Sequence, residues 1–397
     1  MKLHVEKIVA GGNGFSHFDG KAVFIPDALP DEAIEAETVS EKKDFINAKL
    51  TAVLEASAHR VAPLCKLYGE CGGCNLQNAD YEYQLELKRM IIRDVFARAG
   101  IPLSGISPAA MSPIPPSDDF APIITHKSPP WEYRSRIQLH RTAKNKYGFK
   151  SRNEKFVVPV DDCPIAVAAI RAALQNQQFA STKNMQRFTV FSSGSHVFCE
   201  DNSGKTSEYR IRILNNEVYF DIRGFFQSNI HLLEEMLPFV TENITGNTLL
   251  DLYCGSGVFA LFSCLHYRDK GLHAKNITLV EQDKISLACA QKNFLALAGN
   301  TPPNLFALSC KDWVKTFAKT SFDSVIVDPP RSGLEPEVSD WLCKHKAHRI
   351  CYVSCNPVTL ARDSAKLLQA GYTVRAFHFF DFYPQTSHIE CLVCFSS

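Results

Sequence analysis

The chain has 397 residues, with 43 lysines and arginines against 42 aspartates and glutamates, which gives a formal net charge of +1. This balance excludes a protein that coats nucleic acid through an overall positive charge, so any nucleic-acid site must come from a local concentration of cations. The length predicts two or three domains. Apolar residues make up 45% of the chain and charged residues 21%, a composition typical of globular proteins.

Targeting signals and cysteine usage indicate the compartment. The N-terminus carries no apolar stretch of the kind that a secretory signal needs, and no apolar run reaches the ~18 residues of a membrane-spanning helix. Fourteen cysteines without an export signal predict reduced thiols, metal ligands or catalysis rather than disulfides. We therefore expect a cytoplasmic protein with no membrane partner.

The first part of the chain predicts small separate units. Residues 1–58 alternate short β-type runs with turn signals, which predicts a small antiparallel barrel of the OB type. Such barrels bind nucleic acid in some proteins and only support structure in others. The stretch Asp80–Arg98 has a helical spacing of apolar residues. The following stretch, Pro102–Pro130, is rich in proline and serine, which predicts an irregular connector.

The segment Trp131–Phe156 is strand-like and dense in cations and aromatic rings. Its cations are Arg134, Arg136, Arg141, Lys144, Lys146, Lys150, Arg152 and Lys155, and its rings are Trp131, Tyr133, Tyr147 and Phe149. Cations that neutralise phosphates and rings that stack on exposed bases are typical of single-stranded RNA recognition. The same pattern also fits a solvated hairpin with a buried inner face. The motifs downstream favour contact with RNA.

From Thr248 onward, apolar β-type runs alternate regularly with helix-length segments. The runs cover residues 248–253, 277–281, 305–309, 322–327 and 349–354. Such alternation predicts a parallel, doubly wound α/β sheet. Two further runs, Tyr372–Phe382 and Ile389–Phe395, are separated by a short turn and predict a hairpin. That hairpin would place one antiparallel strand in the parallel sheet.

Two motifs at the ends of the first two predicted strands indicate a cofactor that contains a nucleoside. Asp251-Leu-Tyr-Cys-Gly-Ser-Gly follows the first strand, and its glycines allow a ligand to approach the backbone closely. Glu281 ends the second strand, where an acidic side chain typically accepts hydrogen bonds from ribose hydroxyls. The glycine-rich loop alone is a weak signal, and the acid at the strand end strengthens it.

The remaining strand ends carry groups suited to chemistry. Asp328 stands on a Pro-Pro turn after the fourth strand, where a carboxylate can hold a polar ligand group, with a plain turn as the alternative. Cys355 ends the fifth strand beside a helix N-terminus, where the helix dipole is expected to lower the pKa of a thiol. Most cysteines are small buried hydrophobes, but this position predicts a nucleophile. Glu390 begins the last strand, and an antiparallel strand would bring it to the same rim as a general base.

Four further cysteines form a candidate metal site. Cys65, Cys71 and Cys74 are close in sequence, and Cys163 is followed by proline far downstream. A structural zinc site prefers two C-x2-C pairs or added histidines. One such pair, with an outlying cysteine and a Cys-Pro, is found instead in some iron–sulfur runs. The spacing leaves three interpretations open: an iron–sulfur cluster, a zinc ion, or unliganded thiols.

These motifs resemble those of the RNA (uracil-5)-methyltransferases, and the resemblance covers nearly all of the chain. Residues 1–58 are similar to the family's TRAM domain. Ser354-Cys355-Asn356-Pro357 and His388-Ile389-Glu390 match its nucleophile and base motifs, which are highly specific. The branch that the chain resembles most acts on 23S ribosomal RNA and contains an iron–sulfur cluster. Val258 is a departure, because many members have asparagine at this position.

The resemblance implies a role for each matching residue. It implies S-adenosyl-L-methionine (SAM) as the methyl donor, a [4Fe–4S] cluster, Cys355 as the nucleophile and Glu390 as the base. The implied cofactor contacts are Gln227 in Gly224-Phe-Phe-Gln227, Tyr253, Glu281 and Asp328. Asp328 would lie between the cofactor and the target base. The implied cluster ligands are Cys65, Cys71, Cys74 and Cys163.

Together these observations predict three domains and one reaction. We expect a TRAM-like OB barrel over 1–58, a central α+β iron–sulfur and RNA-binding domain over 59–222, and a class I SAM-dependent methyltransferase domain over 223–397. The expected reaction is methylation of C5 of a uridine in RNA, with 23S ribosomal RNA as the partner of a monomeric chain. The alternatives are a uridine in the tRNA T-loop, an amino-group methylation built on Asp328-Pro-Pro, and a non-catalytic RNA-binding factor with a metal knuckle.

Overall fold

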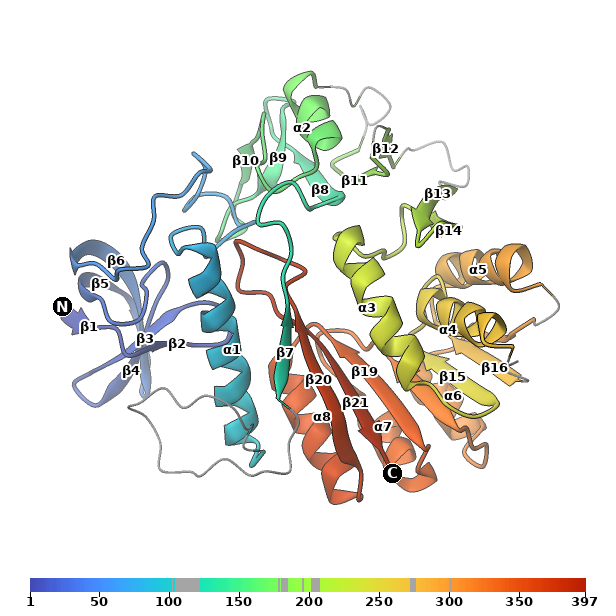
Figure 1. Cartoon of the computed structure of the whole chain (residues 1–397). Coiled ribbons are helices and arrows are strands. Elements are labelled where there is room, and N and C mark those ends of the chain that lie inside the picture. Colours follow the sequence, from blue (N-terminus) through green and yellow to red (C-terminus); the bar gives the residue numbers. More distant parts are fainter. Residues whose placement is uncertain are drawn as a thin grey trace.

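A computed structural model describes residues 1–101, 103, 122–177, 179, 185–194, 196–200, 208–271, 276–299 and 302–397. Much of the predicted connector, residues 104–121, lies outside the described residues. Figure 1 shows a strand-rich N-terminal unit beside helix α1, a central unit above, and a large α/β unit that contains the C-terminus. None of the described helices is both long and apolar enough to cross a membrane.

The N-terminal unit is a six-stranded sheet with the order β1-β5-β6-β4-β3-β2. Its strands are β1 (Lys2–His4), β2 (Lys7–Ile8), β3 (Gly14–Phe18), β4 (Lys21–Ile25), β5 (Ala33–Glu41) and β6 (Phe45–Glu55). Val23 and Ile25 of β4 share one small apolar core, because alternate side chains of a strand face the same side. Strands β4 and β6 run parallel, so the prediction of a purely antiparallel unit is wrong for this pair. The chain reaches β6 through β5, which lies on the other side of β6.

The central unit is a five-stranded sheet with the order β10-β9-β8-β11-β12. Its elements are β8 (Arg136–Arg141), β9 (Tyr147–Lys150), β10 (Val157–Pro159), α2 (Ala168–Gln175), β11 (Arg187–Ser192) and β12 (Val197–Cys199). Ile170 and Leu174 of α2 share an apolar core with Leu139 and Phe188 of the sheet. A hairpin of β13 (Glu208–Ile213) and β14 (Asn216–Asp221) follows in the chain.

Two of the aromatic rings that were expected to meet RNA lie inside the protein. Tyr147 is buried, and its ring packs edge-on against that of Phe188. Tyr133 is also buried, and its hydroxyl donates a hydrogen bond of 3.0 Å to the carbonyl oxygen of Pro384. The predicted stacking role is therefore wrong for these two rings, which instead contribute to packing. The cations nearby remain in solvent: Lys144, Lys146 and Lys150 are exposed.

The α/β unit is built on an eight-stranded sheet with the order β17-β16-β15-β18-β19-β21-β20-β7. Its strands are β7 (Ile123–His126), β15 (Thr248–Leu252), β16 (Asn276–Val280), β17 (Asn304–Phe306), β18 (Ser324–Val327), β19 (Arg349–Ser354), β20 (Thr373–Phe380) and β21 (Glu390–Ser396). Neighbouring strands are parallel except at β21, which is antiparallel to both β19 and β20. The predicted doubly wound sheet with one antiparallel strand is confirmed.

Helices cover both faces of this sheet. One face carries α1 (Tyr81–Arg98), α6 (Cys310–Thr316), α7 (Pro336–His345) and α8 (Pro357–Gln369). The other carries α3 (Ile230–Asn243), α4 (Val258–Asp269) and α5 (Lys284–Asn293), which continues into the π-helical turn η2 (Phe294–Ala298). Successive strand residues therefore both enter an apolar core, as Leu249 and Leu250 do on opposite faces. This double burial explains why the strands read as continuous apolar runs.

Two elements of the α/β unit come from before the predicted domain boundary at residue 223. Strand β7 pairs in parallel with β20 at the sheet edge, and α1 shares the apolar core of α8 (Figure 1). The start of α1 agrees with its predicted position, because Asp80 caps it by accepting a hydrogen bond from the backbone N–H of Tyr83. The sequence does not predict β7, since four residues beside a proline-rich segment show no periodicity.

A buried ion pair joins α1 to the segment after β20. The Nζ atom of Lys88 lies 2.5 Å from Oδ1 of Asp381, and both side chains are fully buried. Lys88→Met is expected to lower the free energy of unfolding by about 3–5 kcal/mol, because it leaves the carboxylate of Asp381 buried without its cation. Urea denaturation monitored by circular dichroism would measure this loss.

The matched control is Lys127→Met, which breaks an ion pair between α1 and the segment after β7. Lys127 and Glu82 lie 2.7 Å apart, with side chains 55% and 69% exposed. Water already solvates both groups, so the free energy of unfolding should change by less than about 1 kcal/mol. Equal effects of the two substitutions would show that burial does not strengthen the Lys88 pair.

Candidate active site

One cavity at the carboxyl ends of the parallel strands contains every predicted catalytic and cofactor-binding residue. Its volume is about 520 Å³. The predicted residues that line it are Gln227, Tyr253, Glu281, Asp328, Cys355 and Glu390. The topology explains this convergence. Strands β15, β16, β18 and β19 end at this rim, and β21 begins there because it runs the opposite way.

The glycine-rich loop after β15 forms one wall of the cavity. Gly257 has a φ of 75° and begins α4 without a side-chain cap. A Cβ at this position would lie 3.0 Å from the Cβ of Ala290, so α5 packs closely against the loop. Tyr253 also has a positive φ of 61°, and its hydroxyl donates to the carboxylate of Glu335. Such backbone conformations bring the chain close to the space that a ligand would occupy.

Glu281 is held in place by the backbone. Its Oε2 accepts from the N–H of Gly255 at 3.0 Å, and its Oε1 accepts from the N–H of Asp283 at 2.8 Å. A carboxylate oxygen can accept more than one hydrogen bond, so Glu281 retains acceptor capacity toward the cavity. This geometry suits the recognition of ligand hydroxyls that the sequence predicts.

Two other cavity residues have buried polar atoms without a partner in the described part of the chain. These atoms are Oε1 of Gln227 and Oε1 of Glu390. Buried polar atoms are normally satisfied, so unpaired atoms that line a cavity indicate where a ligand completes the network. Burial raises the pKa of Asp328, and the charge of Glu281 adds to the effect. Burial likewise raises the pKa of Glu390 well above its usual range, with a contribution from Asp328.

Cys355 lies between the end of β19 and the start of α8. Asn356 caps α8 and donates a hydrogen bond of 2.8 Å from Nδ2 to the carbonyl of Arg331, which fixes the loop. Burial raises the pKa of the Cys355 thiol to about 12, and the charges of Glu390 and Asp328 act in the same direction. The prediction of a lowered pKa is therefore wrong, because desolvation and two carboxylates outweigh the helix N-terminus.

Two cations near Cys355 were not singled out from the sequence as site residues. Arg331 follows Asp328-Pro-Pro and lines the cavity, and its charge opposes the rise in the pKa values of Cys355 and Glu390. Its place in the Asp328 motif could have identified it. Arg134, predicted only as an RNA contact, lines both this cavity and a second one, which the four predicted metal-binding cysteines line. Its dual position depends on tertiary structure, so no sequence signal identifies it.

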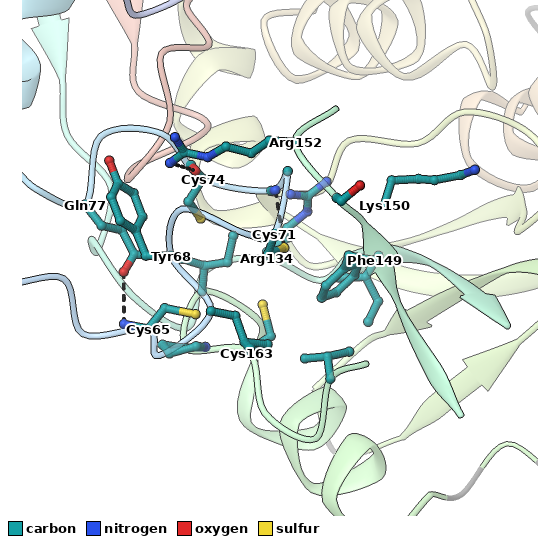
Figure 2. A pocket seen from close by; sticks show the side chains of 18 of the residues that line it. Cys65, Tyr68, Cys71, Cys74, Gln77, Arg134, Phe149, Lys150, Arg152 and Cys163 are labelled. Atoms are coloured by element: carbon teal, nitrogen blue, oxygen red, sulfur yellow. Dashed lines mark hydrogen bonds between the residues drawn. The ribbon is translucent and has the colours of Figure 1, made fainter. Parts of the chain in front are cut away.

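The four predicted metal-binding cysteines line a second cavity, of about 250 Å³. Figure 2 shows the sulfur atoms of Cys65, Cys71, Cys74 and Cys163 directed into the same space. The backbone N–H of Gly73 donates to Sγ of Cys71 at 3.4 Å. In the described part of the chain, no group of three or more histidine, cysteine, aspartate or glutamate side chains is arranged to hold a metal ion. The structure thus brings the four thiols around one cavity and leaves their ligand open.

A third cavity, of about 490 Å³, also includes Cys355 in its lining. It is bounded by the N-terminal unit, by the segment Cys71–Cys74 (the cysteine segment) and by the loop before β21. Asn13, Gly73 and Ser387 line it from these three parts, and Arg152 and Asn356 line it as well. Arg331 lines both this cavity and the first. Cys355 also lines both cavities, so it lies where they meet, one beside the glycine-rich loop and one facing the N-terminal unit.

Comparison with known proteins agrees with this geometry. The model of the tRNA (uracil-5-)-methyltransferase family matches residues 208–397. A Treponema denticola protein named as an uncharacterized RNA methyltransferase is 38% identical over 99% of this chain and 98% of its own. A protein of Shewanella sp. (strain ANA-3), named 23S rRNA (uracil(1939)-C(5))-methyltransferase RlmD, is 29% identical over 97% of this chain and 93% of its own.

A solved structure shares the fold. The crystal structure of Pyrococcus abyssi tRNA (uracil-54, C5)-methyltransferase in complex with S-adenosyl-L-homocysteine matches with a TM-score of 0.73 and 22% identity, and the match covers all of both chains. The sequence matches likewise extend over nearly the whole chain. We conclude that the chain belongs to the family of SAM-dependent RNA (uracil-5)-methyltransferases.

Proposed function

We propose that the chain methylates C5 of a uridine in 23S ribosomal RNA through a covalent bond between Cys355 and C6 of the base. The observation that carries this proposal is the convergence of Cys355, Glu390 and Asp328 on one cavity. An amino-group methylation at Asp328-Pro-Pro would need no thiol, so a cysteine beside a buried glutamate favours carbon methylation. A non-catalytic RNA-binding factor would have no use for either group.

The cavity offers groups that fit SAM. Gln227 has an unpaired buried oxygen, and Glu281 presents a carboxylate fixed by two backbone N–H groups. We assign these two residues, with Tyr253 and Asp328, as the groups that hold the cofactor. Bound SAM supplies an electrophilic methyl group on a sulfonium, and the chain's task is to make C5 of uracil nucleophilic.

Cys355 performs that task by adding to C6. The thiol first loses its proton to water, then a C6–S bond forms and the electron pair of the C5–C6 double bond moves into an enolate with the C4 carbonyl, so that C5 can take the methyl group. After methylation, C5 carries both the methyl group and its original proton. Glu390 removes this proton, the double bond returns and the C6–S bond breaks. The raised pKa of Glu390 suits this role, because a base with a higher pKa accepts a proton more readily.

We propose 23S ribosomal RNA as the substrate because the relative named for that substrate matches the chain over 97% of its length. A uridine in the tRNA T-loop is the second candidate, and the shared fold with the Pyrococcus enzyme supports it. Mass spectrometry of RNA from a knockout strain would decide between them. Loss of one 5-methyluridine from 23S RNA is expected. Loss of the T-loop 5-methyluridine alone would favour tRNA, and no loss in either RNA would contradict the proposed reaction.

We also propose that the N-terminal unit is a TRAM-like OB barrel and that the central unit holds a [4Fe–4S] cluster on Cys65, Cys71, Cys74 and Cys163. The shared cavity of these thiols supports a ligand there. A zinc ion would draw four sulfurs to within about 2.3 Å of one point. A cluster separates its cysteines by its own irons and sulfides, and the resemblance of the chain to the iron–sulfur branch of the family favours a cluster over zinc.

Cys163→Ser is expected to lose most of the iron of the anaerobically purified protein. The wild-type protein should be brown with about four irons per chain, and its broad visible band should bleach in air. Elemental mass spectrometry of the purified protein would measure iron and zinc per chain and so identify what the four cysteines hold. Cys199→Ser is the control, because Cys199 is a half-buried thiol of the same unit outside the cavity. A colourless wild-type protein with one zinc per chain would contradict the cluster.

A further inference from the structure

The turn that leads into Glu390 is held by the cysteine segment. Asn75 directly follows Cys74, and its Oδ1 accepts a hydrogen bond of 2.8 Å from the backbone N–H of Ser387. Its Nδ2 donates to Oγ of the same serine at 3.0 Å. The backbone N–H groups of Asn75 and Leu76 both donate to the carbonyl of Gln385, at 3.2 and 3.0 Å. One short stretch after Cys74 therefore fixes the turn at two places.

Helix α1 holds the same turn through Gln84. Nε2 of Gln84 donates to Oε1 of Gln385 at 3.0 Å, and Oε1 of Gln84 accepts from the N–H of Gln385 at 2.8 Å. Gln385 is buried and has a φ of 68°, a backbone conformation that is strained for any residue other than glycine. Such a conformation persists only where its surroundings determine it. Contacts from outside the hairpin thus add to the turn's own hydrogen bonds in setting its shape.

The N-terminal unit contacts the same point. Gly12 has a φ of 82°, and a Cβ there would lie 2.6 Å from the Cβ of Ser387 and 2.7 Å from Nδ2 of Asn75. Nδ2 of Asn75 also donates to the carbonyl of Gly11 at 3.0 Å. Asn75 is therefore the residue at which the N-terminal unit, the cysteine segment and the catalytic turn meet.

Glu390 depends on this turn for its position. It pairs with Phe380 across the hairpin and is buried, but its Oε1 has no hydrogen-bond partner in the described part of the chain. Its carboxylate is thus placed by the backbone that carries it. Catalysis is sensitive to such placement, since a shift of about 1 Å in a reacting group can cost roughly 100-fold in rate.

We propose that Asn75 is a positioning residue for Glu390, through which the arrangement of the Cys71–Cys74 segment controls release of the methylated RNA. The proposal rests on the proposed function, because it takes Glu390 as the base of that reaction. Its physical content is that a ligand held by the four cysteines fixes the segment, Asn75 fixes Ser387, and Ser387 sets the start of β21. The group that the four cysteines hold would then affect the rate of RNA release without touching the substrate.

The test compares Asn75→Ala and Asn75→Asp with wild type and with Asn304→Ala. Aspartate retains the acceptor for the N–H of Ser387 and loses the donor. Asn75→Asp should therefore show only part of the loss that Asn75→Ala causes. Asn304 is an exposed residue of β17 whose Nδ2 bonds Asn276 at 2.7 Å, far from the turn in the sheet order. Asn304→Ala should behave as wild type in every measurement.

The first measurement is hydrogen–deuterium exchange of the amides of residues 383–390, which needs no RNA. Asn75→Ala should exchange faster in this segment, while the amides of β18 and β19 keep wild-type rates and show that the sheet is intact. Cys163→Ser should produce the same local change, and adding Asn75→Ala to it should have little further effect because both act through one path.

The second measurement separates formation of the covalent complex from its release. Asn75→Ala should slow release by roughly 10- to 100-fold while the rate of complex formation by Cys355 stays within about threefold of wild type. Equal slowing of both steps, or unchanged exchange at 383–390, would overturn the assignment of Asn75. If wild type itself forms no complex with RNA, the proposed function fails, and the exchange data still decide whether Asn75 holds the turn.

Discussion

Cys355→Ser is expected to lower the rate of methyl transfer by roughly 10³-fold or more, because the nucleophile that activates C5 is lost. RNA that carries 5-fluorouridine at the target should trap the wild-type chain as a complex that survives denaturation. Fluorine at C5 cannot leave as a proton, so the base step is blocked and the C6–S bond persists. A shift in mobility on a denaturing gel, followed by mass mapping of the modified peptide, would identify the sulfur involved.

The control for this experiment is Cys343→Ala. Cys343 is a half-buried cysteine of α7, whose thiol donates to the carbonyl of Lys366 and which does not line the catalytic cavity. It should form the trapped complex at the wild-type rate. Trapping by Cys355→Ser at that same rate would eliminate Cys355 as the nucleophile and leave only the cofactor assignments.

Glu390→Gln is expected to accumulate a covalent complex that already carries the methyl group. The amide cannot accept the C5 proton, so multiple-turnover rates should fall by roughly 10²- to 10⁴-fold, the usual contribution of a general base. Methyl transfer in the first turnover should continue. Radiolabelled SAM would show label in the protein–RNA complex, and Glu217→Gln, an exposed acid of β14, should release its product normally.

The pH dependence of release gives a second signature of Glu390. A general base works in its ionised form, and burial and the charge of Asp328 raise the pKa of Glu390. Release by wild type should therefore slow as the pH falls through this raised pKa, at a higher pH than an exposed glutamate would require. The slope should vanish in Glu390→Gln. A pH profile that is the same in both proteins would contradict the assignment.

The sheet and its rim were predictable because their signals are local. Strands buried on both faces read as continuous apolar runs, and the residue after each run falls at the carboxyl rim. The amino-acid sequence alone therefore predicts that Glu281, Asp328 and Cys355 lie together, as they do in the cavity. Glu390 required one further inference, the antiparallel direction of the last strand, and the short turn before it supplied that signal.

The features that sequence could not supply depend on distant contacts or on burial. Strand β7 forms only because β20 offers it an edge. The pKa of Cys355 depends on desolvation and on acids from two other strands, which outweigh the nearby helix N-terminus that the sequence does show. Asn75 and Ser387 are 312 positions apart, so nothing local marks asparagine as their link. Tyr133 and Tyr147 follow an RNA-binding pattern and yet are buried.

The pairing of β7 with the distant strand β20 has a consequence for synthesis of the chain. Helix α1 and strand β7 leave the ribosome before β20 and β21 have been synthesised. The apolar side of α1 and the ammonium of Lys88 therefore lack their partners in the interval. For Lys88 the partner is Asp381, 293 residues later. Contacts of such long sequence separation close late, and exposed apolar surface in the interval invites aggregation or chaperone binding. A fragment limited to 208–397 would meet the same difficulty permanently, because the edge of β20 would lack its neighbour.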